Sequence, residues 1–206
     1  MKTLLSRAVA SVASVGLAVV LAGCSAGVAA IGDLPVTGSA QSAAANTDKQ
    51  LAYAMLHWND YNAAQYGDLN PVGGDCANFV SQTLAARGWQ MNSEWYNHDA
   101  AATWSPAWGY VPAMDTYLRA NAASLGLTEY SFDHRDKITI GDIVMFDWND
   151  NDSLDHVQVV SAVLTSGDTT RIKMVGHNID TDFRDLDTTI TVDHPGAVGH
   201  FWALSK

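Results

Sequence analysis

The sequence predicts an α+β fold in which helices come first and a mostly antiparallel sheet follows. Between residues 47 and 123 apolar residues recur at helical spacing, whereas from Lys137 onward the chain changes to short runs typical of strands. Short turns connect these runs, and strands joined by short turns pair in antiparallel fashion. Helices followed by a block of strands are typical of the α+β class.

Three helices are predicted in the first part of the globular chain. The apolar positions of the first helix, which a cap at Thr47 or Asp48 would precede, are Leu51, Ala54, Met55, Trp58 and Tyr61. Those of the second, for which Gly88 is the stop signal, are Cys76, Phe79, Val80 and Leu84. A third, short helix fits residues 111–123, with Pro112 in its first turn.

Five strands are predicted in the second part, at residues 142–148, 156–164, 170–177, 188–192 and 198–204. The turn between the second and third of these strands centres near Gly167. Pairing about this turn makes partner numbers sum to about 334, so position 156 faces about 178. His177 or Asn178 is therefore expected beside His156, because a shift of one residue in register exchanges the two.

The composition is that of one globular domain with a tail. The chain has 206 residues, of which 48% are hydrophobic and 16% are charged. Its net charge of −11 makes nucleic acid an unfavourable partner. Two cysteines exclude a disulfide framework, a four-cysteine zinc site and an iron–sulfur cluster. The motifs of zinc proteases, serine hydrolases and nucleotide-binding proteins are missing, so no cofactor or metal is expected. We interpret the acidic residues 147–152 as a hairpin loop, with adventitious Ca²⁺ binding as the alternative.

The first residues have the pattern of an export signal. Lys2 and Arg7 precede an apolar stretch that ends in Leu21-Ala22-Gly23-Cys24, which resembles the lipobox of bacterial lipoproteins. We therefore expect a signal peptide at residues 1–23, lipid on Cys24 and a flexible Ala/Ser/Gly tether over residues 24–46. The domain would then occupy residues 47–206 at the outer face of the cytoplasmic membrane. Ordinary secretion after cleavage at Ala30 is the alternative.

Cys76 is the candidate nucleophile. Gly73 and Gly74 allow a tight loop, and Asp75 is a good N-cap that places Cys76 at the first helical position. A helix N-terminus favours a thiolate, and its free N–H groups can stabilise an oxyanion. The alternative is a buried cysteine that packs with Phe79 on an amphipathic helix.

A cysteine nucleophile needs a base, which is usually a histidine held by a third group. His156 is the candidate because it opens an apolar strand, where clefts form at the sheet edge. His177 or Asn178 would orient it. The remaining histidines are expected to be structural or solvated: His57, His98, His134, His194 and His200. Four tryptophans are interpreted either as core packing or as the rim of a substrate groove: Trp89, Trp95, Trp104 and Trp108.

The segment from Gly74 to Gln82, GDCANFVSQ, resembles the core motif of the bacterial putative amidase domain family. The resemblance extends upstream to Trp58 and downstream to the segments GDIVMFDW at 141–148, DHV at 155–157 and GHN at 176–178. That family is similar to NlpC-type and CHAP-type hydrolases, which are papain-like. The resemblance implies a papain-like fold with Cys76 as nucleophile, His156 as base and His177, or else Asn178, as the orienting residue. Its oxyanion side chain remains open between Tyr66, Asn70 and Asp75.

The resemblance also implies a function. It implies an exported cysteine amidase or peptidase that hydrolyses amide bonds, with a substrate in the peptide material of the cell wall. An acyl transferase with the same nucleophile is one alternative, and a non-catalytic wall-binding lipoprotein is another. The expected partners are a peptide or peptidoglycan substrate and, through lipid, the membrane.

Overall fold

The computed structural model describes residues 38–205, with side chains from residue 43 onward. The predicted signal peptide, Cys24 and the tether up to residue 37 lie outside the described residues. Between residues 38 and 205, no helix is both long and apolar enough to cross a membrane.

The longest helix begins earlier than the sequence predicts. Helix α1 spans Gly38–His57, so residues 38–46, which were assigned to the flexible tether, are helical. An Ala/Ser-rich composition is shared by linkers and helices, and alanine is the strongest helix former. Helix α3 spans Cys76–Arg87 and ends at Gly88, whose φ of 113° is left-handed, as predicted. Helix α5 spans Val111–Leu125, close to its prediction. Two single-turn helices, α2 and α4, span Ala63–Tyr66 and Pro106–Gly109.

The sheet is antiparallel throughout, as predicted. Its six strands lie in the order β3-β8-β4-β5-β6-β7, and each neighbouring pair is antiparallel. Their bounds are Leu127–Ser131 for β3, Ile143–Asp147 for β4, His156–Ser166 for β5, Thr169–Gly176 for β6, Thr181–Asp185 for β7 and Val198–Leu204 for β8. A separate two-stranded ribbon joins β1, Asn97–His98, to β2, Thr103–Trp104.

The hairpin of β5 and β6 has the predicted register. Val159 pairs with Val175 and Val160 with Met174, each a sum of 334. A bulge between Val160 and Ala162 changes the sum by one toward the turn.

The predicted strand at residues 188–192 is wrong. The chain there forms α6, Leu186–Thr188, and continues into a π-type turn over Thr189–Asp193. Asp185 caps this segment by accepting the N–H of Thr188, and two threonine hydroxyls donate back to carbonyls four residues earlier. A threonine-rich run therefore has strand propensity but satisfies its polar groups within helical turns. Strands β3 and β7, which are more polar, were not predicted.

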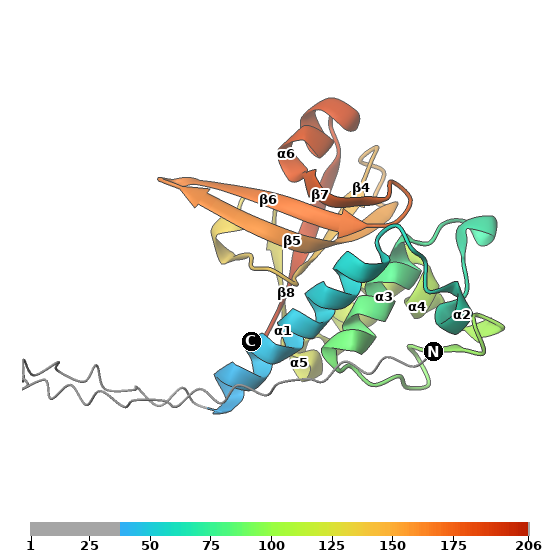
Figure 1. Cartoon of the computed structure of the whole chain (residues 1–206). Coiled ribbons are helices and arrows are strands. Elements are labelled where there is room, and N and C mark those ends of the chain that lie inside the picture. The colour runs from blue at the N-terminus through green and yellow to red at the C-terminus, as the bar shows by residue number, and fades with distance from the viewer. Residues whose placement is uncertain (1–37, 206) are drawn as a thin grey trace, which may run out of the picture. The chain divides into compact units, whose positions relative to one another are not determined.

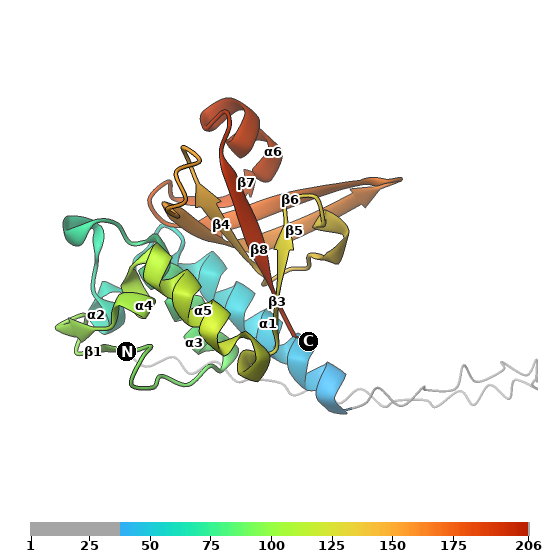
Figure 2. The same ribbon diagram turned by 180° about the vertical axis from the view of Figure 1, so that it is seen from behind.

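The sheet separates two apolar clusters (Figures 1 and 2). Helices α1, α3 and α5 cover one face, which we call the helix face, and α6 covers the opposite face, the α6 face. On the helix face, Cys76 and Phe79 of α3 pack with Val157 and Val159 of β5. On the α6 face, the cluster includes Val144, Phe146, Val160, Met174 and Leu186. Neighbouring residues of one strand thus belong to different clusters, as the alternation of a strand requires.

Candidate active site

Cys76 is the first residue of α3, as predicted. Gly73 and Gly74, with φ of 133° and 132°, lead the chain into the helix in a conformation that disfavours other residues. The thiol is free, and Cys76 is 7% exposed.

The cap of α3 differs from the prediction. Asp75 occupies the N-cap position, but its side chain makes no capping hydrogen bond to the helix backbone. Its Oδ1 accepts instead from the N–H of Leu69 and from Nδ2 of Asn78, each at 2.8 Å. The carboxamide of Asn178 takes the capping role, because its Oδ1 accepts from the N–H of Asp75 at 2.7 Å and of Cys76 at 2.8 Å. The first N–H groups of α3 are therefore already engaged by the protein's own chain.

His177 is buried beside the start of α3. Its Nδ1 lies 2.5 Å from Oδ2 of Asp75, and its Nε2 lies 2.8 Å from the carbonyl oxygen of His57. The ring of Tyr61 stacks on the imidazole at 3.6 Å between ring centroids. A carbonyl only accepts, so Nε2 donates to it, and Nδ1 forms the hydrogen bond with Asp75. Both ring nitrogens are thus occupied in this arrangement, and the role of His177 here is to hold Asp75.

His156 lies on the α6 face, away from Cys76. Its imidazole packs against Phe146 and Trp148, and its neighbour Val157 points to the helix face. Burial lowers the pKa of His156 from 6.5 to about 3, and the charges of Arg184 and His194 add to this effect. Among the residues that the structure describes, none forms a hydrogen bond with its Nε2.

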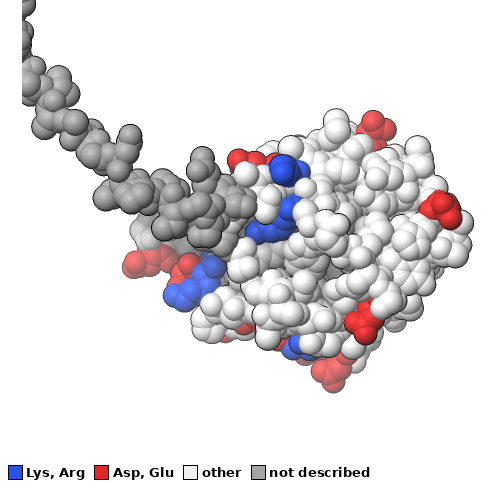
Figure 3. Space-filling model, turned by 90° about the horizontal axis from the view of Figure 1, so that it is seen from below, with Lys and Arg blue, Asp and Glu red and all other residues white. Residues whose placement is uncertain are grey.

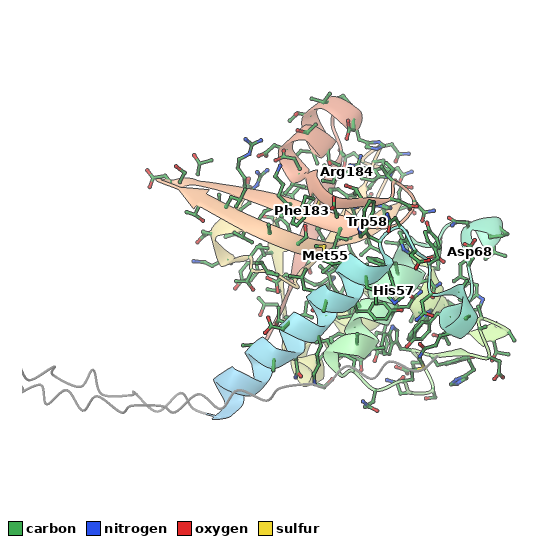
Figure 4. All side chains as sticks on the ribbon, in the orientation of Figure 1. Met55, His57, Trp58, Asp68, Phe183 and Arg184 are labelled. Atoms are coloured by element: carbon green, nitrogen blue, oxygen red, sulfur yellow. The ribbon has the colours of Figure 1, made fainter. Side chains whose placement is uncertain are left out.

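The prediction that His156 and His177 lie side by side is therefore wrong. The register is the predicted one, and continued beyond the pair Val159–Val175 it would set position 156 opposite 178 rather than 177. Because alternate residues face opposite ways, His156 and His177 point to different faces of the sheet. In Figure 4, Arg184 lies on the α6 side of the sheet, and His57 lies at the end of α1 on the helix side.

The thiol of Cys76 is not acidic in this environment. Burial raises its pKa from 9.0 to about 11, although the backbone N–H groups of Val157 and Ala77 act in the opposite direction. The negative charge of Asp75 raises it further. The expectation of a depressed pKa, which rested on the helix N-terminus alone, is wrong here because desolvation outweighs that effect.

Cys76 nevertheless lines an open cavity of about 360 Å³. Three segments form its walls: the loop before α3 with Gly74, the segment with Trp104 and Tyr110, and the β4–β5 loop with Ser153 and Asp155. The tryptophans therefore divide between the two interpretations: Trp95 and Trp108 are buried in the core, whereas Trp104 lines the cavity.

Both buried tryptophans hold α3 in place. The indole N–H of Trp108 donates to Oδ1 of Asn78 at 2.7 Å, and that of Trp95 donates to the hydroxyl of Ser81 at 3.0 Å. These bonds satisfy buried polar groups two and five residues along α3 from the nucleophile.

The two remaining candidates for the oxyanion side chain are Asn70 and Tyr66. Asn70 accepts from Nδ2 of Asn178 and so belongs to the same network. Tyr66 packs on Trp108, and its hydroxyl accepts from Gln65, away from the cavity lining.

A second cavity of about 530 Å³ adjoins the first through Pro112 and Leu154. Asp115 forms its best-defined polar group, accepting from His200 and from the indole of Trp202 at 2.9 Å each. Burial opposes ionisation of Asp115, but these hydrogen bonds outweigh it and lower its pKa. Sequence reasoning missed this network, because Asp115 lies 85 and 87 residues before His200 and Trp202 and no local motif marks them.

The acidic loop after β4 is organised around Asp147. Its carboxylate accepts the N–H groups of Asn149, Asn151 and Asp152, which matches the hairpin interpretation. Within residues 38–205 no three His, Cys, Asp or Glu side chains are grouped as metal ligands would be. On the face seen from below in Figure 3, most of the side chains not covered by grey atoms are uncharged.

Comparison with known proteins identifies a family. A family profile described as Putative amidase domain matches residues 44–202, which is most of the chain and almost all of the described part. No curated protein and no solved structure matches the chain.

Proposed function

Since the chain belongs to the Putative amidase domain family, we propose that it is an amidohydrolase with Sγ of Cys76 as its nucleophile. The observation that carries this proposal is the position of Cys76, at the first turn of α3 and in the wall of an open cavity. The backbone N–H groups of Val157 and Ala77 interact with the sulfur and partly offset the effect of burial on its pKa. The family assignment supplies the bond type, and the cavity supplies access to the thiol.

The reaction would proceed in two steps. The thiolate attacks the amide carbonyl, the C–N bond breaks, and a proton moves to the departing amine to leave a thioester on Cys76. Water, which gives up a proton to a base, then attacks the thioester and releases a carboxylate and the thiol. Because the pKa of the thiol is about 11, a base must remove its proton near neutral pH.

We assign that base to His156, on three grounds. The resemblance of the segment DHV at 155–157 to the family pattern supports this role. It is the first residue of β5, and the N–H of the next residue, Val157, already interacts with the sulfur. Its Nε2 gains no hydrogen bond from the described residues on the α6 face, and an unsatisfied buried group of this kind costs about 1–3 kcal/mol. His156 pairs with Phe146 of β4 and packs on the α6 face, so the proposal requires the start of β5 to rearrange before the imidazole can reach Cys76.

The proposed substrate class rests on the predicted export signal. A signal peptide at residues 1–23 and lipid on Cys24 would hold the domain outside the cytoplasmic membrane. Peptide amides of the cell wall are the abundant amide substrates in that place, so we propose peptidoglycan peptides as the substrate.

The test is cleavage of purified peptidoglycan by the full chain, followed by mass spectrometry of the fragments. The wild-type protein is expected to create new amine and carboxylate ends, and Cys76→Ala to create none. His134→Ala, at an exposed turn outside this cavity, is the control and should cleave like wild type. Equal cleavage by Cys76→Ala would refute the proposal.

A further inference from the structure

The amide side chain of Asn178 occupies a pair of backbone donors at the nucleophile. Its Oδ1 lies 2.7 Å from the nitrogen of Asp75 and 2.8 Å from that of Cys76. One of these two donors, the N–H of Cys76, belongs to the same residue as the candidate nucleophile. Two converging N–H groups beside a nucleophile are the arrangement that stabilises the oxyanion of acyl transfer.

The backbone is shaped to allow this contact. Asn178 has a φ of 70°, a left-handed conformation that asparagine tolerates better than most residues. Gly74 faces it, and a Cβ at Gly74 would lie 3.1 Å from Oδ1 of Asn178. The adjacent His177, fixed by Asp75 and by the carbonyl of His57, sets the position of the turn.

Resting on the proposed function, we propose that Asn178 is an intramolecular stand-in for substrate. Its carboxamide has the same chemical group as a peptide bond, and its oxygen takes the place where the carbonyl oxygen of the scissile amide binds. The substrate amide must displace it before Cys76 can attack.

The side chain of Asn178 can leave the two N–H groups without disturbing the core. Asn178 is exposed, and the partner of its Nδ2, Asn70, is exposed as well. The carboxamide can therefore swing into water, where its hydrogen bonds are replaced, without opening the core. By contrast, His177 is fully buried and stays in place, so only the side chain of Asn178 has to move.

The inference predicts a selective effect on reagents that carry a carbonyl group. Iodoacetamide has a carboxamide oxygen that can use the two N–H groups, whereas iodoethane alkylates a thiol without one. The ratio of the two alkylation rates of Cys76 therefore reports whether the donor pair is free. General changes in thiol acidity or exposure alter both rates together and cancel in the ratio.

The experiment measures this ratio for wild type, Asn178→Gly and Asn178→Asp in the full chain. Glycine suits the φ of 70° and removes the carboxamide, so the ratio is expected to rise about 2- to 10-fold, the range for one net hydrogen bond. Aspartate keeps an acceptor oxygen and is expected to leave the ratio at or below the wild-type value. Asn92→Ala is the matched control, because Asn92 also caps two backbone N–H groups, those of Glu94 and Trp95.

An unchanged ratio in Asn178→Gly would overturn the inference, as would an equal rise in Asn92→Ala. Alkylation needs no turnover, so this result is separate from the peptidoglycan assay. If Asn178→Gly raises the ratio while Cys76→Ala still cleaves peptidoglycan, the donor pair is supported and the proposed function is refuted.

Discussion

Oδ2 of Asp75 and Nδ1 of His177 lie 2.5 Å apart in the core, 102 residues apart in the sequence. Both side chains are almost fully buried. Asp75 directly precedes the candidate nucleophile, and His177 directly follows β6. This contact therefore joins the sheet to the start of α3, and it couples the position of Cys76 to the stability of the fold.

Replacing His177 should destabilise the protein strongly. His177→Ala leaves the carboxylate of Asp75 buried with one partner lost, for which about 3–5 kcal/mol is expected. Urea unfolding followed by far-UV circular dichroism gives the change in free energy of unfolding. His134→Ala, at an exposed turn, is the control and should change it by less than about 0.5 kcal/mol. A loss below about 1 kcal/mol for His177→Ala would show that the pair is not stabilising.

Protonation of His156 should destabilise the fold at acid pH. Its pKa falls from 6.5 to about 3 on folding, so the unfolded chain binds this proton more readily than the folded one. Neutral His156 therefore makes its full contribution to the free energy of unfolding above pH 6.5. This contribution is lost as the pH falls toward 3, at up to about 1.4 kcal/mol per pH unit. His156→Phe removes the titration and fills the site.

The measurement is the free energy of unfolding of wild type and His156→Phe between pH 7 and pH 4. The wild-type curve should fall more steeply than that of the variant over this range. Parallel curves would contradict the burial of a neutral His156.

Alkylation of Cys76 should be slow at neutral pH. With a pKa of about 11, the thiol holds less thiolate than an ordinary cysteine, and its rate with iodoacetamide should still rise above pH 9. Mass spectrometry of protein labelled between pH 6 and pH 10.5 gives the rate profile, and a cysteine-containing peptide provides the reference. A plateau below pH 7 would instead support the activated thiolate that the sequence alone suggested.

The sequence predicted the local elements of the fold better than the contacts between distant side chains. Local signals located α3, because Gly88 ends it and the glycines before Asp75 begin it, and the turn at Gly167 set the register of β5 and β6. The pairing of side chains across the molecule was not accessible in the same way. Whether His156 meets Cys76 depends on the face to which the first residue of a strand points, and one step along the chain reverses it. Likewise, the sequence predicts Asp75 as the cap of α3, but its carboxylate binds Asn78 and His177 instead. The side chain of Asn178 accepts the backbone N–H groups at this helix end.

Cys24 should carry lipid. The run Leu21-Ala22-Gly23-Cys24 ends the apolar stretch, so Cys24 is expected to become the modified N-terminal residue of the mature protein. Mass spectrometry of the mature N-terminus and fractionation of cells producing wild type or Cys24→Ala provide the measurement. Wild type should remain with membranes, and the variant should be released or left unprocessed. A wild-type protein that is soluble outside the cell and starts at residue 31 would contradict the prediction.

Turnover should depend on the imidazole of His156 more than on any other histidine. Without a base the thiol stays protonated, so loss of His156 should reduce kcat/KM about 10²- to 10⁴-fold, the usual contribution of general base catalysis. His156→Phe is the informative variant, because Phe can pack against Phe146 and Trp148 as the imidazole does. It should keep the free energy of unfolding near the wild-type value at neutral pH and still lose activity. His194→Phe is the matched control, since His194 also stacks on Trp148, at 3.9 Å between ring centroids, and it should retain activity. If His156→Phe cleaves peptidoglycan as fast as His194→Phe, the imidazole of His156 belongs only to the core of the α6 face, and the base must be sought on the helix face beside Cys76.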